Sequence, residues 1–346
     1  MYYHNFDEFK TDVFNNAKNR VDRLIPLNSI SLNSRGNTFI NGELYLTDNS
    51  FHNHLAQRLD IPIQYYRKMR EEARDLLQAS VNTWIDKQDY KKQVLLRSYE
   101  KTKESKYRFL NWNSTVKKAR GLVSNRYKIM DNAEILEGLQ YMIDDTDVVS
   151  CYNSSEITQI KMTFPRLEAE IRKGDIVKGG LVLRNSELGF SSITATAFIY
   201  RLACLNGMVM PNVLAVNRKY HIGKKISDIS YELPEELISQ LAGMILDLQN
   251  QTNFSKTING LKNATIMKIQ KMDYVRLQND WNITQVESDA IKENLEAEGD
   301  MSKYGLIQAI TATAKKINNI QRNIHLERVG GKLLSMPMQQ WSELAS

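Results

Sequence analysis

The sequence predicts an α+β fold with a mostly antiparallel central sheet, helices on one face, a helical N-terminal segment and a helical C-terminal region. Three observations predict this class. Apolar residues near the start recur at helical spacing, the middle holds strand-like segments joined by hairpin-length turns, and the pattern after Pro234 is almost wholly helical. The 346 residues are 42% apolar and 25% charged, which excludes general disorder because enough apolar surface exists to offset the ordering entropy.

The first segment, residues 1–90, is expected to combine helices with short strands. In order, its expected elements are a helix over 6–24, strands over 27–32 and 38–46, a helix that carries Phe51, Leu55 and Leu59, and a helix from Pro62 to about Lys87. Thr47 or Asp48 can cap the second of these helices, and proline is favoured in the first turn of a helix.

The second segment, residues 91–233, is expected to be the antiparallel sheet. Its strand-like stretches are 94–99, 108–112, 121–124, 148–153, 158–164, 176–184 and 191–200, and one helix is expected over 132–143. Side-chain alternation is clearest in 193–200, where Ile193, Ala195 and Ala197 alternate with threonines.

The third segment, residues 234–329, is expected to be helical, and residues 330–346 a short C-terminal tail. Four helices are expected, over 234–254, 255–280, 284–297 and 302–326. Thr284 and Glu287 have the spacing of a capping box at the start of the third.

Cysteine usage and hydropathy indicate the compartment. The two cysteines, Cys151 and Cys204, are expected to be buried and reduced. No apolar run approaches the ~18 residues of a membrane span, and the first residues include acidic ones where a signal peptide has a basic start. We therefore expect a cytoplasmic protein with no membrane partner.

The positive charge is concentrated in one stretch. Between Lys91 and Lys128 there are twelve basic residues and two acidic ones, a local excess of ten charges against +6 for the whole chain. Aromatic residues are interleaved with them. Basic side chains neutralise phosphates and aromatic faces stack on unpaired bases, so the pattern is typical of single-strand binding. A solvated basic face whose aromatic residues are part of the core explains it equally well.

A second basic and aromatic cluster occupies residues 217–225. From both stretches, the candidate phosphate contacts are Arg97, Lys106, Arg108, Lys117, Lys118, Arg120, Arg126, Lys128, Arg218, Lys219, His221, Lys224 and Lys225. The candidate base-stacking residues are Tyr107, Trp112, Tyr127 and Tyr220.

Sequence motifs of enzymes are missing. The chain contains no HExxH, Walker A, GxGxxG or GxSxG pattern, and His52 and His54 are spaced so that a helix would separate their rings. No catalytic residue, cofactor or metal site is therefore expected, although carboxylates that converge only in the fold would escape this search.

Three segments resemble a known family. They are residues 120–132, residues 179–211 with the ending RLACLNGMVMP, and His221-Ile222-Gly223. Their spacing resembles that of a phage- and plasmid-like family designated domain of unknown function 932, and the late segment KYGLIQAITATA resembles its closing helix. The sequence Val-Ser-Asn-Arg at 123–126 departs from the family, where an acidic residue is common.

The resemblance covers roughly residues 90–325 and implies a context of phage and plasmid proteins that handle DNA. The family lacks an agreed activity, but its sheet-plus-helix pattern is similar to that of single-strand annealing recombinases. We therefore expect a phage or mobile-element protein that binds single-stranded DNA, promotes annealing without nucleotide hydrolysis and forms a homo-oligomeric ring or filament. The alternatives are a metal-dependent nuclease with dispersed carboxylates and a regulator that binds an acidic protein.

Overall fold

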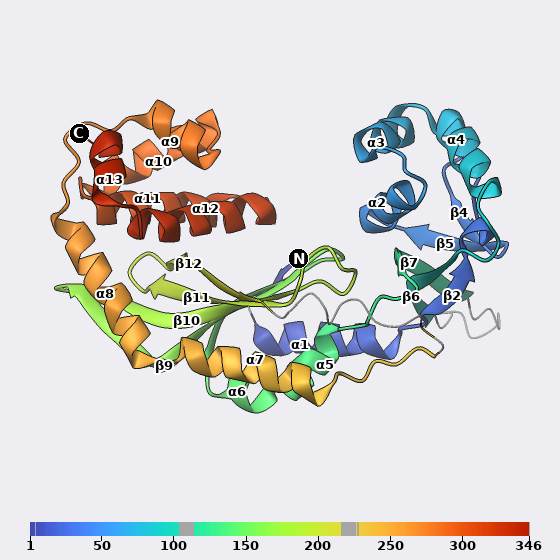
Figure 1. Cartoon of the computed structure of the whole chain (residues 1–346), viewed down its shortest axis with the longest axis horizontal. Coiled ribbons are helices and arrows are strands. Elements are labelled where there is room, and N and C mark those ends of the chain that lie inside the picture. Colours follow the sequence, from blue (N-terminus) through green and yellow to red (C-terminus); the bar gives the residue numbers. More distant parts are fainter. Residues whose placement is uncertain (4, 104–113, 216–225, 227, 346) are drawn as a thin grey trace.

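The α+β class is confirmed, and the strands are divided between two six-stranded sheets, A and B. The computed structural model describes residues 1–3, 5–103, 114–215, 226 and 228–345. In Figure 1 the chain forms an open arch, with the C-terminal helices above sheet A in one arm and residues 23–103 and 114–124 in the other. None of the helices in these residues is both long and apolar enough to cross a membrane.

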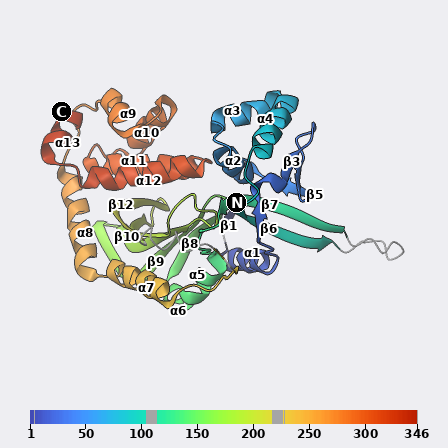
Figure 2. The same ribbon diagram turned by 45° about the vertical axis from the view of Figure 1, so that its right-hand side comes forward.

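Sheet B is mixed and is built from the early part of the chain. Its strand order is β2 (Arg23–Pro26), β6 (Gln93–Lys103), β7 (Ser114–Ser124), β5 (Glu43–Thr47), β4 (Thr38–Ile40) and β3 (Ile30–Leu32). All neighbours are antiparallel except β5 and β7, which are parallel. Figure 2 shows β6 and β7 side by side and extending away from the rest of the protein.

Three helices cover sheet B and give it a hydrophobic core of its own. They are α2 (Asn49–Arg58), α3 (Ile63–Glu72) and α4 (Arg74–Asp86). Asp48 caps α2 by accepting a hydrogen bond from the Phe51 amide, as expected. Phe51 and Leu55 from α2 pack with Leu77 from α4 against strand residues such as Leu122. The single helix expected over 62–87 is interrupted at Ala73, where the backbone leaves the helical conformation.

Sheet A is wholly antiparallel. Its order is β1 (Tyr2–Tyr3), β8 (Asp147–Asn153), β9 (Thr158–Arg172), β10 (Asp175–Asn185), β11 (Thr194–Arg201) and β12 (Asn206–Ala215). Paired residues across a sheet share a face, and the row Tyr3, Cys151, Ile160 and Leu183 makes one face apolar. That face belongs to the main hydrophobic core.

The helices nearest this apolar face are α1 (Phe6–Lys18), α5 (Asn132–Gly138), α6 (Gln140–Asp144) and α7 (Glu235–Leu248). Phe9 of α1 and Leu237 of α7 are both fully buried in the core. The first helix ends at Lys18 and not at residue 24, because the chain turns there and Val21 donates a hydrogen bond to the Ser98 carbonyl of β6.

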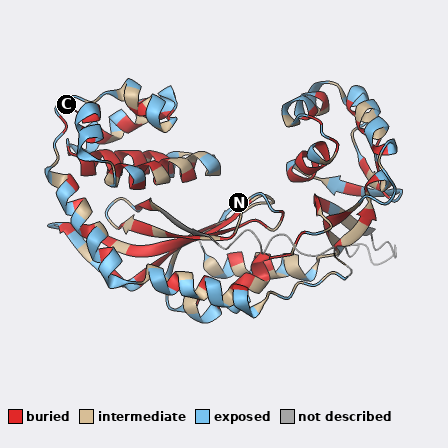
Figure 3. Cartoon of the chain, viewed as in Figure 1, coloured by how far each residue is buried: buried red, intermediate tan, exposed pale blue. Residues whose placement is uncertain are grey.

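The C-terminal region contains more and shorter helices than the four expected. They are α8 (Gln251–Ile266), α9 (Tyr274–Trp281), α10 (Gln285–Glu298), α11 (Lys303–Lys316), α12 (Ile320–Leu334) and α13 (Met338–Ala345). The capping box of Thr284 and Glu287 is confirmed at the start of α10. Figure 3 shows α11 and α12 as the most buried of these helices.

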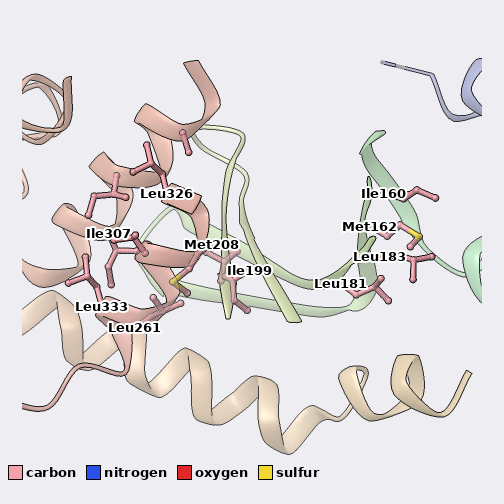
Figure 4. Packing of buried hydrophobic residues seen from close by; sticks show 14 of the residues in the cluster. Ile160, Met162, Leu181, Leu183, Ile199, Met208, Leu261, Ile307, Leu326 and Leu333 are labelled. Carbon is pink, nitrogen blue, oxygen red and sulfur yellow. The ribbon is translucent and has the colours of Figure 1, made fainter. Parts of the chain in front are cut away.

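Residues 330–334 belong to α12 and not to a tail. A Cβ at Gly331 would lie 2.1 Å from the carbonyl oxygen of Val209, so the absence of a side chain lets α12 lie directly on β12. Leu326 and Leu333 of α12 pack in the same core as Met208 and Ile199 (Figure 4). Of the two cysteines, which are both free, Cys151 is buried as expected, but Cys204 lies in the turn after β11 and is partly exposed.

Candidate functional site

A buried arginine connects the two halves of the molecule. Arg97 lies in β6 with no exposed surface, and its guanidinium group forms ion pairs with Asp22 at 2.9 Å and with Asp131 at 2.5 Å. Its Nη1 donates a hydrogen bond to the backbone carbonyl of Glu187 at 3.0 Å. Asp22 precedes β2, whereas Asp131 precedes α5 and Glu187 follows β10, so one side chain of sheet B is bonded to elements around sheet A.

The same group of charges fixes the connection between β10 and β11. Arg120 of β7 forms an ion pair with the Glu187 carboxylate. The other oxygen of that carboxylate accepts hydrogen bonds from the backbone and side-chain nitrogens of Asn132 at 3.0 and 2.9 Å. The Tyr127 hydroxyl donates to the carbonyl of Ser186 at 3.2 Å. The segment 186–192 is therefore held in a fixed position against the end of β7.

The charges in this network stabilise one another. Burial alone would lower the pKa of Arg97, but Asp131 and Asp22 outweigh it and hold that pKa well above its usual value. Burial alone would raise the pKa of Asp131, but Arg97 and Arg120 outweigh it and hold that pKa below its usual value. Both groups are therefore charged in the folded protein at neutral pH.

Three of the residues predicted to contact nucleic acid belong to this buried network, and those predictions are corrected. Arg97 is wholly buried, Arg120 is 4% exposed and Tyr127 is 7% exposed. Arg97 and Arg120 neutralise carboxylates, and the Arg120 guanidinium lies 4.0 Å above the Tyr99 ring. Neither arginine is free to bind a phosphate, and the Tyr127 ring cannot stack on a base.

The remaining predicted residues on β7 and beyond it lie nearer the surface. Lys117 forms an ion pair with Glu43 at 2.6 Å, and Lys118 lies 3.6 Å from Asp48. Arg126 is exposed and Lys128 is partly exposed. The described part of the basic stretch is thus divided between core ion pairs and surface cations.

The other predicted residues lie outside the described part of the chain. They are Lys106, Tyr107, Arg108, Trp112, Arg218, Lys219, Tyr220, His221, Lys224 and Lys225. The strand expected over 108–112 lies outside it as well.

A cavity of about 500 Å³ lies where α2, the end of β7 and the segment 186–192 meet. Its lining residues are His54, Gln57, Arg58, Val123, Ser124, Arg126, Tyr127, Leu188, Gly189, Phe190, Ser191 and Ser192. We call it the arginine cavity. Arg126 reaches it from the turn that follows β7, in which the Tyr127 amide donates to the Ser124 carbonyl at 2.9 Å.

Close packing of α2 on β7 shapes this cavity. A Cβ at Gly121 would lie 2.8 Å from Nδ1 of His54, so glycine is needed for the two elements to approach this closely. His54 Nδ1 accepts a hydrogen bond from the Leu122 amide at 3.2 Å. Arg58 lies one turn further along the same side of α2, and its Nε donates to the Leu122 carbonyl at 3.3 Å.

The arginine cavity is positively charged. Arg58 and Arg126 line it, and no Asp or Glu is among its described lining residues. Burial lowers the pKa of His54 to about 4, with a further contribution from Arg58, so this ring is neutral at pH 7. The hydroxyl of Ser191 has no hydrogen-bond partner in the described part of the chain. Cationic and hydroxyl donors without a carboxylate are what an anionic ligand requires.

An aromatic ring lies at the same cavity. Phe190 is 37% exposed and stacks on His54, with ring centroids 4.5 Å apart and planes 11° from parallel. Its amide donates to the hydroxyl of Ser186 at 3.0 Å, which fixes the backbone that carries the ring. A half-exposed and rigidly mounted aromatic ring beside two arginines can stack on a base whose phosphate the arginines hold.

Sequence reasoning identified Arg126 but missed Arg58 and Phe190. Arg58 ends a helix that looked like a packing unit, and Phe190 lies in a short connection with no local excess of charge. The one signal was the glycine and serines around Phe190, at 189 and 191–192, which are typical of a loop that carries a site.

Carboxylates from distant parts of the chain do converge, as the nuclease hypothesis requires. Asp22, Asp131, Glu134 and Glu187 all lie in the network around Arg97, but each forms an ion pair with an arginine. In the residues that the structure describes, no group of three or more His, Cys, Asp or Glu side chains is placed to hold a metal ion. The arrangement therefore favours a structural network over a metal centre.

Comparison with known families identifies one family. The model of a family described as a domain of unknown function (DUF932) matches residues 119–329, which is more than half of the chain, and the chain belongs to this family. The match begins just before Arg120 and includes Arg126, Phe190 and every strand of sheet A except β1. No curated protein and no solved structure matches the chain.

Removing Arg97 should destabilise the protein strongly. Arg97→Met leaves Asp22 and Asp131 with one cationic partner fewer in a buried site, and such a change typically lowers the free energy of unfolding by about 3–5 kcal/mol. Urea unfolding of the variant measures it. Lys101→Met, on the exposed part of the same strand, is the control and should change the free energy by no more than about 0.5 kcal/mol. If Arg97→Met lowers the free energy of unfolding no more than Lys101→Met does, the ion pairs of Arg97 contribute little to stability.

The histidine beside the cavity should make stability depend on pH. The pKa of His54 is about 4 in the folded protein and 6.5 ordinarily, so between these values the unfolded chain binds a proton that the folded protein does not. Its stabilising contribution is complete above pH 6.5 and is lost as the pH falls toward 4. The expected slope is at most ~1.4 kcal/mol per pH unit.

The matched variant is His54→Asn, whose side-chain oxygen can accept the Leu122 hydrogen bond in place of Nδ1 but does not titrate. Thermal melting from pH 7 to pH 4.5 should show a smaller fall in Tm for this variant than for the parent. Parallel curves would mean that His54 is not the titrating group.

Proposed function

We propose that the protein binds single-stranded nucleic acid and that the arginine cavity receives one nucleotide of the strand. The observation that carries the proposal is a cavity with two arginines, an exposed aromatic ring and no carboxylate among its described lining residues. Arg58 and Arg126 would bind a backbone phosphate, and the Phe190 ring would stack on the adjoining base. An unpaired strand fits this chemistry because its bases are free to stack.

The exposed cations near the cavity support an extended path for the strand. Lys101 is exposed on β6, and Lys118 and Arg126 are exposed on β7 and in the turn that follows it. A second cavity, of about 340 Å³, is lined by Lys101 and Lys118 together with polar residues, and the paired Arg120 and Glu187 also line it. A phosphate backbone that follows β7 would pass both cavities.

We further propose that strand annealing in phage or plasmid recombination is the biological role, with DNA as the natural ligand. The support is the resemblance of residues 120–132 and 179–211 to a family with phage and plasmid members. Annealing is downhill once strands are concentrated and freed of secondary structure, so no nucleotide hydrolysis is required. Display of several strands side by side favours a homo-oligomer.

Charge removal in the cavity tests the binding proposal. Arg58→Gln and Arg126→Gln should weaken binding of oligonucleotides of any sequence, and each should reduce the log–log salt dependence by roughly 0.7, the value for one phosphate of a single strand. Fluorescence anisotropy at several salt concentrations measures both quantities. The control is Arg35→Gln, an exposed arginine in the turn between β3 and β4. If both cavity variants bind as tightly as the control at every salt concentration, the proposal is wrong.

The aromatic ring gives a test that depends on strand type. Phe190→Leu retains an apolar side chain but removes the stacking face, and it should weaken single-strand binding by roughly 1–3 kcal/mol while leaving duplex binding nearly unchanged. The same titration with single-stranded and duplex oligonucleotides measures the difference. Equal losses for the two would argue against stacking, and a parent protein that binds an acidic protein but no oligonucleotide would favour the regulator alternative.

A further inference from the structure

The face of sheet A opposite the apolar one carries a row of polar and cationic side chains. Tyr2 pairs with Tyr152, Tyr152 with Gln159, and Gln159 with Arg184, so these four side chains form one row across β1, β8, β9 and β10. Lys161 lies two residues from Gln159 on the same strand and therefore on the same face. None of these residues is among those that line the arginine cavity.

Arg184 is buried without a full set of partners. The residue is only 3% exposed, and its Nε donates to the side-chain oxygen of Gln159 at 2.6 Å. Neither Nη1 nor Nη2 has a hydrogen-bond partner in the described part of the chain. A buried guanidinium group with unused donors is unfavourable unless something accepts from it.

Helix α12 brings a second arginine and one carboxylate to the same place. Glu327 forms an ion pair with Lys161 through its Oε1. Its Oε2 and the Nε of the adjacent Arg328 are both buried with no hydrogen-bond partner among the described residues. Lys161, Arg184 and Arg328 are three cations against the single carboxylate of Glu327. Burial lowers the pKa of Arg184 to about 10, with a further contribution from the Arg328 charge.

We propose that Arg184 and Arg328 form an oxyanion site that takes a phosphate group, supplied by a nucleic-acid backbone or by free phosphate. A tetrahedral dianion or a backbone phosphodiester can accept hydrogen bonds from both guanidinium groups at once, which neutralises the excess charge and satisfies the unused donors. Tyr2 is 44% exposed and packs against Tyr152 at a centroid distance of 4.9 Å, so aromatic surface adjoins the site.

Access to this site depends on Arg328. The Nη atoms of Arg184 are covered by protein, whereas the Arg328 side chain is partly exposed to solvent. In the proposed site an anion would therefore enter past the Arg328 side chain. Arg328 is therefore the residue to alter, because its partial exposure also makes the variant the less damaging of the two to folding.

The experiment compares thermal melting in sodium phosphate and in sodium chloride at equal pH and ionic strength. Phosphate should raise the Tm of the parent by roughly 2–4 °C at ten times its dissociation constant, because only the folded protein has the site. Arg328→Gln should abolish that rise. Lys332→Gln, which removes an exposed charge one turn further along α12, is the matched control and should retain it.

Two outcomes would overturn the proposal: a parent Tm that is the same in both salts, or a phosphate-dependent rise that persists in Arg328→Gln. Arg184→Lys, which keeps the charge but not the paired donors, gives a second measurement and should reduce the rise. Because the readout is stabilisation by phosphate and the residues are not those of the arginine cavity, failure here is distinguishable from failure of the single-strand binding proposal.

The source of the phosphate is decided by competition. If a short oligothymidylate removes the phosphate-dependent rise in the parent and binds more weakly to Arg328→Gln than to Lys332→Gln, the site takes a nucleic-acid backbone. If the rise persists in the presence of the oligonucleotide, the site takes free phosphate. Both results support the site, and only the origin of its ligand differs between them.

Discussion

The ion pairs of Arg97 are the interaction on which the rest of the structure depends. Sheets A and B have separate hydrophobic cores, so apolar packing stabilises each half by itself. Arg97 extends from sheet B to Asp131 and Glu187, and a buried cation can remain there only while these acceptors stay in place. The positions of Asp131 and Glu187 relative to sheet B are therefore fixed by these polar contacts with Arg97, and not by apolar packing.

The arginine cavity follows from that constraint. Its walls come from α2 and β7 on the sheet B side and from residues 186–192 on the sheet A side, and Glu187 is the residue through which the second wall is fixed. Charges that are buried and paired set the geometry. The charges on Arg58 and Arg126, which face no carboxylate among the described lining residues, are available for a ligand. The described part of the basic stretch is thus divided: Arg97 and Arg120 are buried and paired with carboxylates, whereas Arg126 is exposed and belongs to the proposed binding site.

Local sequence patterns predicted many helices and strands, but they could not predict contacts between residues that are far apart in the sequence. The capping box at Thr284 and the alternation in 193–200 depend on neighbours within a few residues, so both could be recognised. The partners of Arg97 could not, because Asp131 is 34 residues away and nothing local distinguishes a buried arginine from an exposed one. The sequence could not show that the strands form two sheets and not one, because strand periodicity does not reveal which strands pair. Arg58 and Phe190 were missed for the same reason: they come together only when α2 and the segment 186–192 both pack at the end of β7.

The position of β1 has a consequence for how the chain is made. All six strands of sheet B lie before residue 125, so that sheet can be complete while the rest of the chain is still being translated. Tyr2 and Tyr3, by contrast, pair with Tyr152 and Cys151 of β8, which are synthesised about 150 residues later. Strand β1 leaves the ribosome before the strands of sheet B. Its partner β8 is synthesised after them, when sheet B is able to form. The vectorial order of synthesis and the order of assembly are therefore different for β1.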